Sequence, residues 1–344
     1  MDVLSIPSPT LATANPLAGR ASLSVIVPVY NEVDVLPEFH RRLAAVLDAI
    51  QADAEIVYVN DGSSDGTIAL ITALREADTR VALIDLSRNF GKEIAMSAGL
   101  DHAHGDAVVV IDADLQDPPE LIPDMVRAWH EGFDVVLMRR RSRAQESWFK
   151  KATARAFYRA IGRMGTIDIP ENVGDFRLLS RRAVAALRQF PERSRFMKGL
   201  FAWIGFPCRE LEYDRDGRQA GVTKWNYWRL WNFALEGITS FSVVPLKVAS
   251  YIGVVTALVA FAYGVYVIGK TLLYGDAVRG YPTLIVVVLF LGGLQLMALG
   301  VIGEYLARMF IEVKQRPLYL VQQALPPKRP LPAPHPQGSD VGVR

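Results

Sequence analysis

The chain has 344 residues, 51% of them apolar, and a formal net charge of +2. This length exceeds that of a usual single domain, so we expect one large domain and a smaller part. The near-neutral charge argues against nucleic acid as a partner, because any basic surface must be local. The single cysteine, Cys208, excludes an intrachain disulfide and a cysteine-based metal site.

Residues 1–20 lack a basic start followed by an apolar run, so we expect a disordered leader and no cleaved signal peptide. Short β-branched runs then alternate with segments of helical period. The expected strands are 24–30, 55–59, 81–86 and 107–111, and the expected helices are 35–50, 68–77 and 94–103. This order predicts an α/β fold with a mainly parallel, doubly wound sheet. A ligand site should lie beyond the carboxyl ends of the strands, at Tyr30, Asp61, Arg88 and Asp112.

Two uncharged apolar runs of 22 residues, 248–269 and 282–303, distinguish the last third of the chain. Each is long enough to cross a bilayer as a helix, whereas two buried core helices of this length in tandem would be unusual. More cations flank the pair than lie in the loop between the runs, so the positive-inside rule favours cytosolic termini. We therefore expect a disordered leader (1–20), a cytosolic domain with juxtamembrane helices (21–242), two transmembrane helices (243–305), a cytosolic segment (306–322) and a proline-rich disordered tail (323–344).

An acidic sequence, Asp112-Ala-Asp-Leu-Gln-Asp117, directly follows the last expected strand. A turn there would let both Asp112 and Asp114 reach one hard cation, and Gln116 could add a neutral oxygen. Mg²⁺ is typically bound by one or two protein carboxylates together with substrate phosphates, so these two aspartates would suffice. The alternative is an acidic turn that caps the helix beginning near Pro118.

Two further loops are expected at the same edge of the sheet. Residues 61–66 resemble the start of an EF-hand, but the twelfth position is Thr72 and no helix precedes the loop, which excludes calcium binding. We expect Asp61 to bind a ligand and Asp65 to cap the next helix, and a purely structural turn is the alternative. In the loop 87–92, Arg88 and Lys92 could bind a diphosphate, or the loop could simply be solvated.

Four segments in register resemble the family 2 glycosyltransferases of GT-A fold, and specifically their polyprenyl-phosphate branch, which includes bactoprenol glucosyltransferases and dolichol-phosphate mannose synthases. They are residues 25–32 (VIVPVYNE), 59–67 (VNDGSSDGT), 112–120 (DADLQDPPE) and 173–178 (VGDFRL). Residues 303–319 resemble the end of the two-span bacterial members, which favours the bactoprenol type. The resemblance covers roughly residues 22–320.

The resemblance implies the inverting transfer of one sugar from a nucleotide-sugar donor, expected to be UDP-linked, to a polyprenyl phosphate. The nucleoside would be held by Pro28, Tyr30, Glu32, Asp61 and Asp112. A metal ion on the diphosphate, Mg²⁺ or Mn²⁺, would be held by Asp114 and Gln116, and Asp175 would be catalytic. The resemblance further implies a homo-oligomer, a tetramer, in the bacterial inner membrane.

Physical reasoning leaves the role of Asp175 open. A bound cation offsets the charge that develops on the leaving diphosphate. The second pKa of a phosphate monoester is about 6, so the lipid phosphate is already largely dianionic and needs little deprotonation. Asp175 could therefore act as the base or orient the sugar or the acceptor. The alternative is a loop carboxylate paired to Arg177.

A lipid phosphate needs cations near the membrane, and residues 139–143 and 150–151 are rich in arginine and lysine. By the family pattern the acceptor phosphate should contact Arg140, Arg143 and Lys150, and an ordinary solvated helix face is the alternative. Residues 195–206 could lie flat in the headgroup layer or form a buried core helix. In the loop 216–224, we expect Arg218 and Lys224 to close over phosphates, and a static linker is the alternative.

Two other functions are compatible with parts of this pattern. A processive polysaccharide synthase shares the domain type, but its Gln-x-x-Arg-Trp motif is absent and it needs more spans. A catalytically silent membrane scaffold should have lost Asp114 or Asp175, and both are present. The sugar stays open among glucose, galactose, N-acetylglucosamine and an amino-arabinose derivative.

Overall fold

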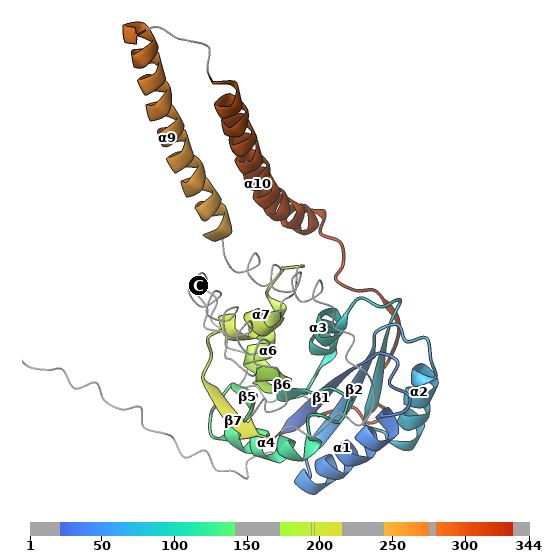
Figure 1. Ribbon diagram of the computed structural model, residues 1–344. Coiled ribbons are helices and arrows are strands. Elements are labelled where there is room, and N and C mark those ends of the chain that lie inside the picture. The colour runs from blue at the N-terminus through green and yellow to red at the C-terminus, as the bar shows by residue number, and fades with distance from the viewer. Residues whose placement is uncertain are drawn as a thin grey trace, which may run out of the picture.

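The computed structural model describes residues 21–141, 173–193, 195, 197–214, 244–274 and 280–332. An eight-stranded sheet forms the centre, in the order β7-β5-β6-β4-β1-β2-β3-β8 (Figure 1). The strands are β1 (Ser22–Val29), β2 (Asp53–Asn60), β3 (Val81–Leu86), β4 (Ala107–Val110), β5 (Val135–Arg140), β6 (Val173–Ser180), β7 (Cys208–Tyr213) and β8 (Val321–Leu325). Only β6 and β8 run antiparallel to the strands beside them within this described sheet. The prediction of a mainly parallel sheet is confirmed.

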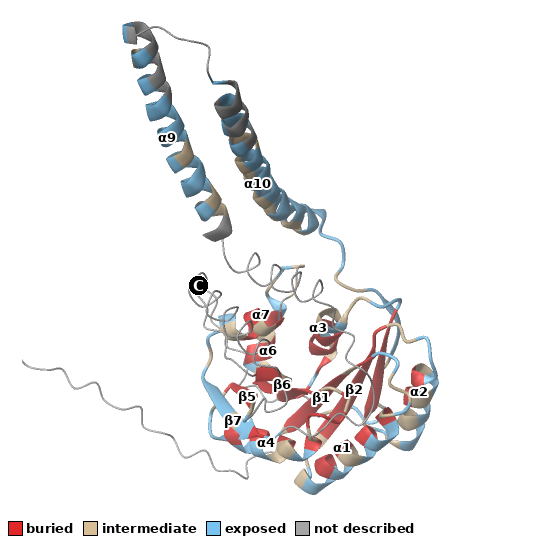
Figure 2. Cartoon of the chain, in the orientation of Figure 1, coloured by how far each residue is buried: buried red, intermediate tan, exposed pale blue. Residues whose placement is uncertain are grey.

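Helices cover both faces of the sheet (Figure 1). One face carries α1 (Leu36–Ile50), α2 (Thr67–Ala77) and α4 (Ile122–His130), the last preceded by a short 3-10 helix, Pro119–Leu121. The other face carries α3 (Lys92–His102), α6 (Arg181–Arg188) and α7 (Met197–Trp203). The central strands are therefore buried on both sides (Figure 2), which explains why their sequences are continuous apolar runs.

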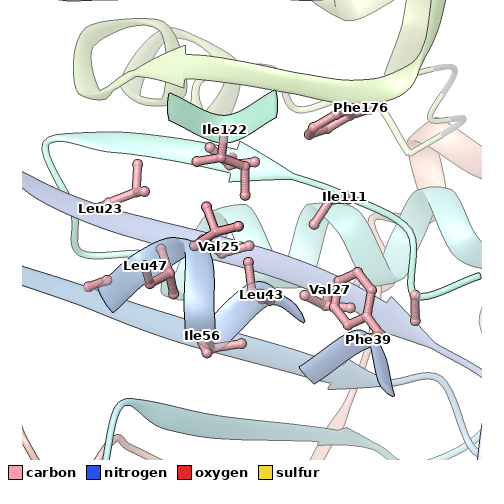
Figure 3. Packing of buried hydrophobic residues seen from close by; sticks show 14 of the residues in the cluster. Leu23, Val25, Val27, Phe39, Leu43, Leu47, Ile56, Ile111, Ile122 and Phe176 are labelled. Carbon is pink, nitrogen blue, oxygen red and sulfur yellow. The ribbon is translucent and has the colours of Figure 1, made fainter. Parts of the chain in front are cut away.

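Alternate residues of β1 pack against opposite helix layers. Val25 and Val27 lie in the same cluster as Phe39 of α1 (Figure 3), whereas Ile26 belongs to the cluster under α3. A Cβ built on Gly99 would lie 2.3 Å from Cγ2 of Ile26, so α3 reaches the sheet this closely only because position 99 has no side chain. This packing fixes α3, and with it the lysine at its start, against β1 and β2.

Two long apolar helices follow the domain, α9 (Val244–Tyr274) and α10 (Tyr281–Lys314), and they extend side by side away from the sheet (Figure 1). Their exposed side chains include Leu258, Phe261 and Leu296, and a bilayer would bury such a surface. Within the described residues, 290–314 are long and apolar enough to cross a membrane, and 248–263 form a shorter apolar stretch. A membrane crossing by the first expected run, 248–269, and with it the two-span arrangement, therefore stays a prediction.

The end of the chain differs from the expected disordered tail at 323–344. Strand β8 pairs with β3, and beyond it the backbone N of Arg329 donates to the carbonyl of Thr79 at 3.0 Å. Lys328 also pairs with Glu76, at 2.5 Å. The expectation is wrong for residues 323–332, because the edge of β3 offers backbone partners to a strand too short to show a pattern of its own. Residues 1–20 and 333–344 lie outside the described part.

Candidate active site

The expected polar side chains meet at one edge of the sheet. Tyr30 follows β1, Asp61 follows β2 and Asp112 closely follows β4, and parallel pairing brings these carboxyl ends together. Strand β6 is antiparallel to β4, with Arg177 opposite Val110, so the first residues of β6 reach the same edge. Asp175 is therefore a strand residue that lies beside the loops of the parallel strands.

Lys92 joins two acidic side chains at this edge. Its Nζ donates to Oδ2 of Asp112 at 2.7 Å and to Oδ2 of Asp175 at 2.5 Å. Burial alone would lower the pKa of Lys92, but the charges of Asp112 and Asp175 outweigh it and hold the pKa well above its usual value. The sequence predicts a diphosphate partner for Lys92, and in this structure its partners are two carboxylates.

Asp175 is ionised and only partly satisfied. Burial would raise its pKa, but Lys92 and Lys198 hold the pKa well below its usual range. Its Oδ1 is buried and has no hydrogen-bond partner among the described residues, a costly state that a substrate hydroxyl or water would relieve. The alternative partner, Arg177, instead donates to the carbonyl oxygen of Gly174 at 2.6 Å and to that of Asp175 at 3.3 Å.

Sequence reasoning missed two charged residues beside Asp175. Oε2 of Glu93 accepts a hydrogen bond from the backbone N of Met197 at 3.0 Å, which ties the start of α7 to the first turn of α3. The next residue, Lys198, is the cation that acts most strongly on Asp175 after Lys92. Burial and the charge of Asp175 raise the pKa of Glu93 to about 7. Positions 93 and 197 are 104 residues apart, so no local pattern could reveal this contact.

Asp61 holds the neighbouring loop in place. Its Oδ1 accepts from the backbone N of Phe90 at 2.7 Å, and its Oδ2 accepts from that of Gly91 at 3.0 Å. Burial raises the pKa of Asp61, although both hydrogen bonds favour the carboxylate. A Cβ on Gly62 would lie 2.4 Å from the backbone carbon of Arg88, so the two loops touch only because position 62 is glycine. Asp61 thus shapes the predicted diphosphate loop, and its contact with a nucleoside stays a prediction.

The other predicted nucleoside residues lie at the start of this edge. Tyr30 is 48% exposed just beyond β1, and Pro28 is partly exposed within it. The backbone N of Glu32 donates to Oγ1 of Thr67 at 3.1 Å, which joins the two loops. The N-cap residue of α2 is Gly66 and not the predicted Asp65, which lies one position earlier and accepts from the backbone N of Thr67 at 3.0 Å. An exposed aromatic ring beside polar loops suits stacking on a base, and these nucleoside contacts stay predictions.

The turn after β4 carries the predicted metal ligands. Leu115 has a φ of 58°, and Oδ1 of Asp114 accepts from the backbone N of Gln116 at 3.1 Å. Gln116 is buried, with only 8% of its surface exposed. No group of three or more His, Cys, Asp or Glu residues that could hold a metal occurs in the part of the chain that the structure describes. That Asp112, Asp114 and Gln116 hold a Mg²⁺ or Mn²⁺ ion, with substrate phosphates as the remaining ligands, stays a prediction.

Of the residues predicted to bind the acceptor phosphate, Arg140 is the one that lies in the described part of the chain. Arg140, at the end of β5, lies 4.0 Å from Asp117. The other members of the predicted acceptor set and the two loop-closing residues lie outside the described ranges: Arg143, Lys150, Arg218 and Lys224.

Helix α7 resolves the two alternatives for residues 195–206. Met197, Leu200 and Phe201 are buried against the sheet layer, so the core-helix interpretation is confirmed for this part. Trp203 at its end is 57% exposed.

Residues 24–188 match the family described as glycosyl transferase family 2, and residues 244–309 match the family described as the GtrB C-terminal hairpin. The chain is 54% identical over 299 residues to an uncharacterized glycosyltransferase of Synechocystis, covering 87% of this chain and 94% of that protein. It is 48% identical to the SfII prophage-derived bactoprenol glucosyl transferase of Shigella flexneri, covering 88% of this chain and 98% of that protein. A prophage bactoprenol glucosyl transferase homolog of Escherichia coli is also 48% identical, with the same coverage.

Proposed function

The chain belongs to glycosyl transferase family 2 and is a glycosyltransferase, and from this premise we propose that it transfers one sugar from a UDP-linked donor to a polyprenyl phosphate. The transfer takes place at the cytosolic face of the bacterial inner membrane. Relatives named bactoprenol glucosyl transferase align over almost their whole length, including the apolar hairpin, and support this acceptor and glucose as the sugar. The observation that carries the proposal is the bridge from Asp112 through Lys92 to Asp175 at the carboxyl edge of the sheet.

The donor binds across the carboxyl ends of β1, β2 and β4. Tyr30 stacks on the base, and the loop that Asp61 holds through Phe90 and Gly91 lies under the diphosphate. Lys92 is placed to exchange one carboxylate partner for a phosphate oxygen, because its side chain is 42% exposed while it bridges the two acids.

A divalent cation, when bound, supplies Lewis-acid stabilisation of the departing diphosphate. Asp112 and Asp114 would hold it together with phosphate oxygens, as a hard cation prefers. The protein's own contribution is a fixed ammonium at Lys92, positioned by α3 before the reaction begins. Preorganised charge of this kind is effective because it needs no reorganisation as the leaving group becomes negative.

Asp175 orients a substrate group in this account. Its low pKa makes it a weak base, and a lipid phosphate that is already ionised needs little help in losing a proton. The unsatisfied Oδ1 can accept a hydrogen bond from a sugar hydroxyl, which holds the anomeric carbon towards the acceptor. A direct attack by the phosphate oxygen inverts that carbon.

A panel of labelled nucleotide sugars tests the proposal. The full chain is reconstituted in vesicles containing polyprenyl phosphate and assayed with Mg²⁺, with Mn²⁺ or with EDTA. We expect one product that extracts into organic solvent and carries one sugar per lipid phosphate, with UDP-glucose as the preferred donor. EDTA should abolish its formation and excess metal should restore it.

The Asp114→Asn variant is the matched control for the EDTA experiment, because it keeps the shape of the turn and removes one predicted metal-binding charge. It should lose the transfer activity that EDTA abolishes. A labelled polymer in the aqueous phase would show a processive synthase instead. Absence of turnover with every nucleotide sugar, despite measurable binding of one of them, would show a silent binding protein. Either result contradicts the proposal.

A further inference from the structure

The third acidic residue of the turn after β4 contacts a different set of partners from the first two. Asp117 is 1% exposed, and its Oδ1 accepts a hydrogen bond from the hydroxyl of Tyr213, the last residue of β7. The same hydroxyl accepts from Nε of Arg140 at 3.3 Å. Nη2 of Arg140 also lies 4.0 Å from Oδ1 of Asp117. The turn therefore reaches across to the ends of β5 and β7.

Gly174 of β6 makes room for the guanidinium group of Arg140, because it has no side chain. A Cβ built on Gly174 would lie 2.9 Å from Nη2 of Arg140, with Cζ the next nearest atom at 3.7 Å. The guanidinium group thus lies over the backbone of the residue directly before Asp175. Any larger residue at position 174 would have to displace it.

Tyr213 and Asp117 hold the guanidinium group of Arg140 on one side, and the rest of the side chain stays accessible to a ligand. Its side chain is 25% exposed, whereas Tyr213 is 4% exposed and packs edge-on against Phe176. A planar guanidinium that is already oriented loses little freedom when it binds a phosphate through two hydrogen bonds. Asp117 and Tyr213 supply that orientation from groups that are themselves fixed in the core.

The sheet order separates Arg140 from the predicted donor contacts. From β6, strands β4, β1 and β2 lie on one side, and their loops carry Asp112 and the predicted nucleotide contacts. Strands β5 and β7 lie on the other side of β6, and their ends carry Arg140 and Tyr213. A direct displacement needs the entering and leaving oxygens on opposite sides of the anomeric carbon. With Asp175 of β6 in between, the side of β5 and β7 is that of the entering oxygen.

We propose that Asp117 and Tyr213 are positioning residues that hold Arg140 for an oxygen of the acceptor phosphate. One turn then serves both substrates, because Asp112 and Asp114 face the donor and its metal while Asp117 fixes the acceptor side. This inference rests on the proposed function, since it assumes a lipid phosphate as the acceptor. Both the donor diphosphate and the acceptor offer phosphate oxygens, so the test must separate the two.

Steady-state kinetics of Tyr213→Phe and Asp117→Asn, with each substrate varied in turn, provides that separation. We expect the KM for polyprenyl phosphate to rise about fivefold to tenfold in each variant and the KM for the nucleotide sugar to stay within about twofold. In an Arg140→Gln background the Tyr213→Phe change should add nothing, because the residue it positions is gone. Tyr58→Phe is the matched control, since it removes another buried hydroxyl, bonded to His40 at 3.0 Å, on a strand that β6, β4 and β1 separate from β5.

A second variant guards against a trivial loss of folding. Gly174→Ala keeps every charge and every hydrogen-bonding group but crowds the guanidinium, so it should also raise the acceptor KM. A rise in the donor KM instead would assign Arg140 to the diphosphate and overturn the inference. So would unchanged acceptor kinetics in well-folded variants, or an equal effect of Tyr213→Phe with and without Arg140. Failure of the wild-type protein to use any lipid phosphate would refute the proposed function itself, a separate outcome.

Discussion

Replacing Lys92 by methionine keeps the length of the side chain and removes the ammonium between Asp112 and Asp175. The two carboxylates, whose oxygens lie 2.7 and 2.5 Å from the ammonium in the wild type, lose their shared counter-charge. Breaking a buried ion pair by removing one partner costs about 3–5 kcal/mol. Lys92 is 42% exposed, so solvent screening reduces this, and we expect a loss of about 2 kcal/mol at pH 7.

The pH dependence distinguishes this cause from a packing defect. In the wild-type protein the pKa of Asp175 is depressed, so its contribution to stability is present above its unfolded pKa, near 4, and is lost as the pH falls through that value and below. The Lys92→Met variant lacks that contribution. The stability difference between the two proteins should therefore be largest near neutral pH and shrink in acid.

Thermal unfolding of the full chain in lipid nanodiscs, without metal or donor, measures this difference. A loss of about 2 kcal/mol corresponds to a fall in Tm of roughly 4–8 °C for a domain of this size. Lys328→Met is the control, because it removes a lysine that pairs with the exposed Glu76 at 2.5 Å, and it should leave Tm unchanged. A Lys92→Met protein as stable as the wild type at pH 7, or a difference that is constant across pH, would refute the reasoning.

Two further predictions follow from the same edge of the sheet. The pKa of Glu93 is raised to about 7, so its contribution to stability is present below about pH 4.5 and is lost as the pH rises through 7. The Tm of the wild type relative to that of Glu93→Gln should fall between pH 5 and pH 8, and a constant difference would contradict this. Asp61→Ala should release the loop at Phe90 and Gly91 and raise the donor KM at least about tenfold, with the acceptor KM little changed. Equal rises in both KM values would show a general loss of structure.

The first half of the sheet could be predicted from the sequence because its strands and helices have clear periods. Strand β3 has the predicted bounds, Val81–Leu86, and the polar ends of β1, β2 and β4 converge as parallel topology requires. The second half carries less local information. The antiparallel β6, the edge strand β7 and the returning β8 are defined by their neighbours in space, and only the motif around Asp175 marked any of them.

The site was predictable in its residue types and less so in its contacts. A lysine in a glycine loop suggests a phosphate, and nothing local reveals that Lys92 would reach carboxylates 20 and 83 residues further along the chain. The same holds for Asp117, which belongs to a recognised acidic motif but contacts Tyr213, 96 residues away. These contacts join residues that are far apart in the sequence and meet only in the folded chain, so no local sequence pattern predicts them.

Single-turnover and steady-state transfer by Asp175→Asn tests the central claim most directly. The asparagine keeps the size of the side chain and removes the charge that holds Lys92 and orients the substrate. With polyprenyl phosphate vesicles and UDP-glucose, kcat should fall by about 10², because the sugar is no longer held towards the acceptor, while the donor KM changes by less than about threefold. Transfer of sugar to the lipid at the wild-type rate would contradict the account.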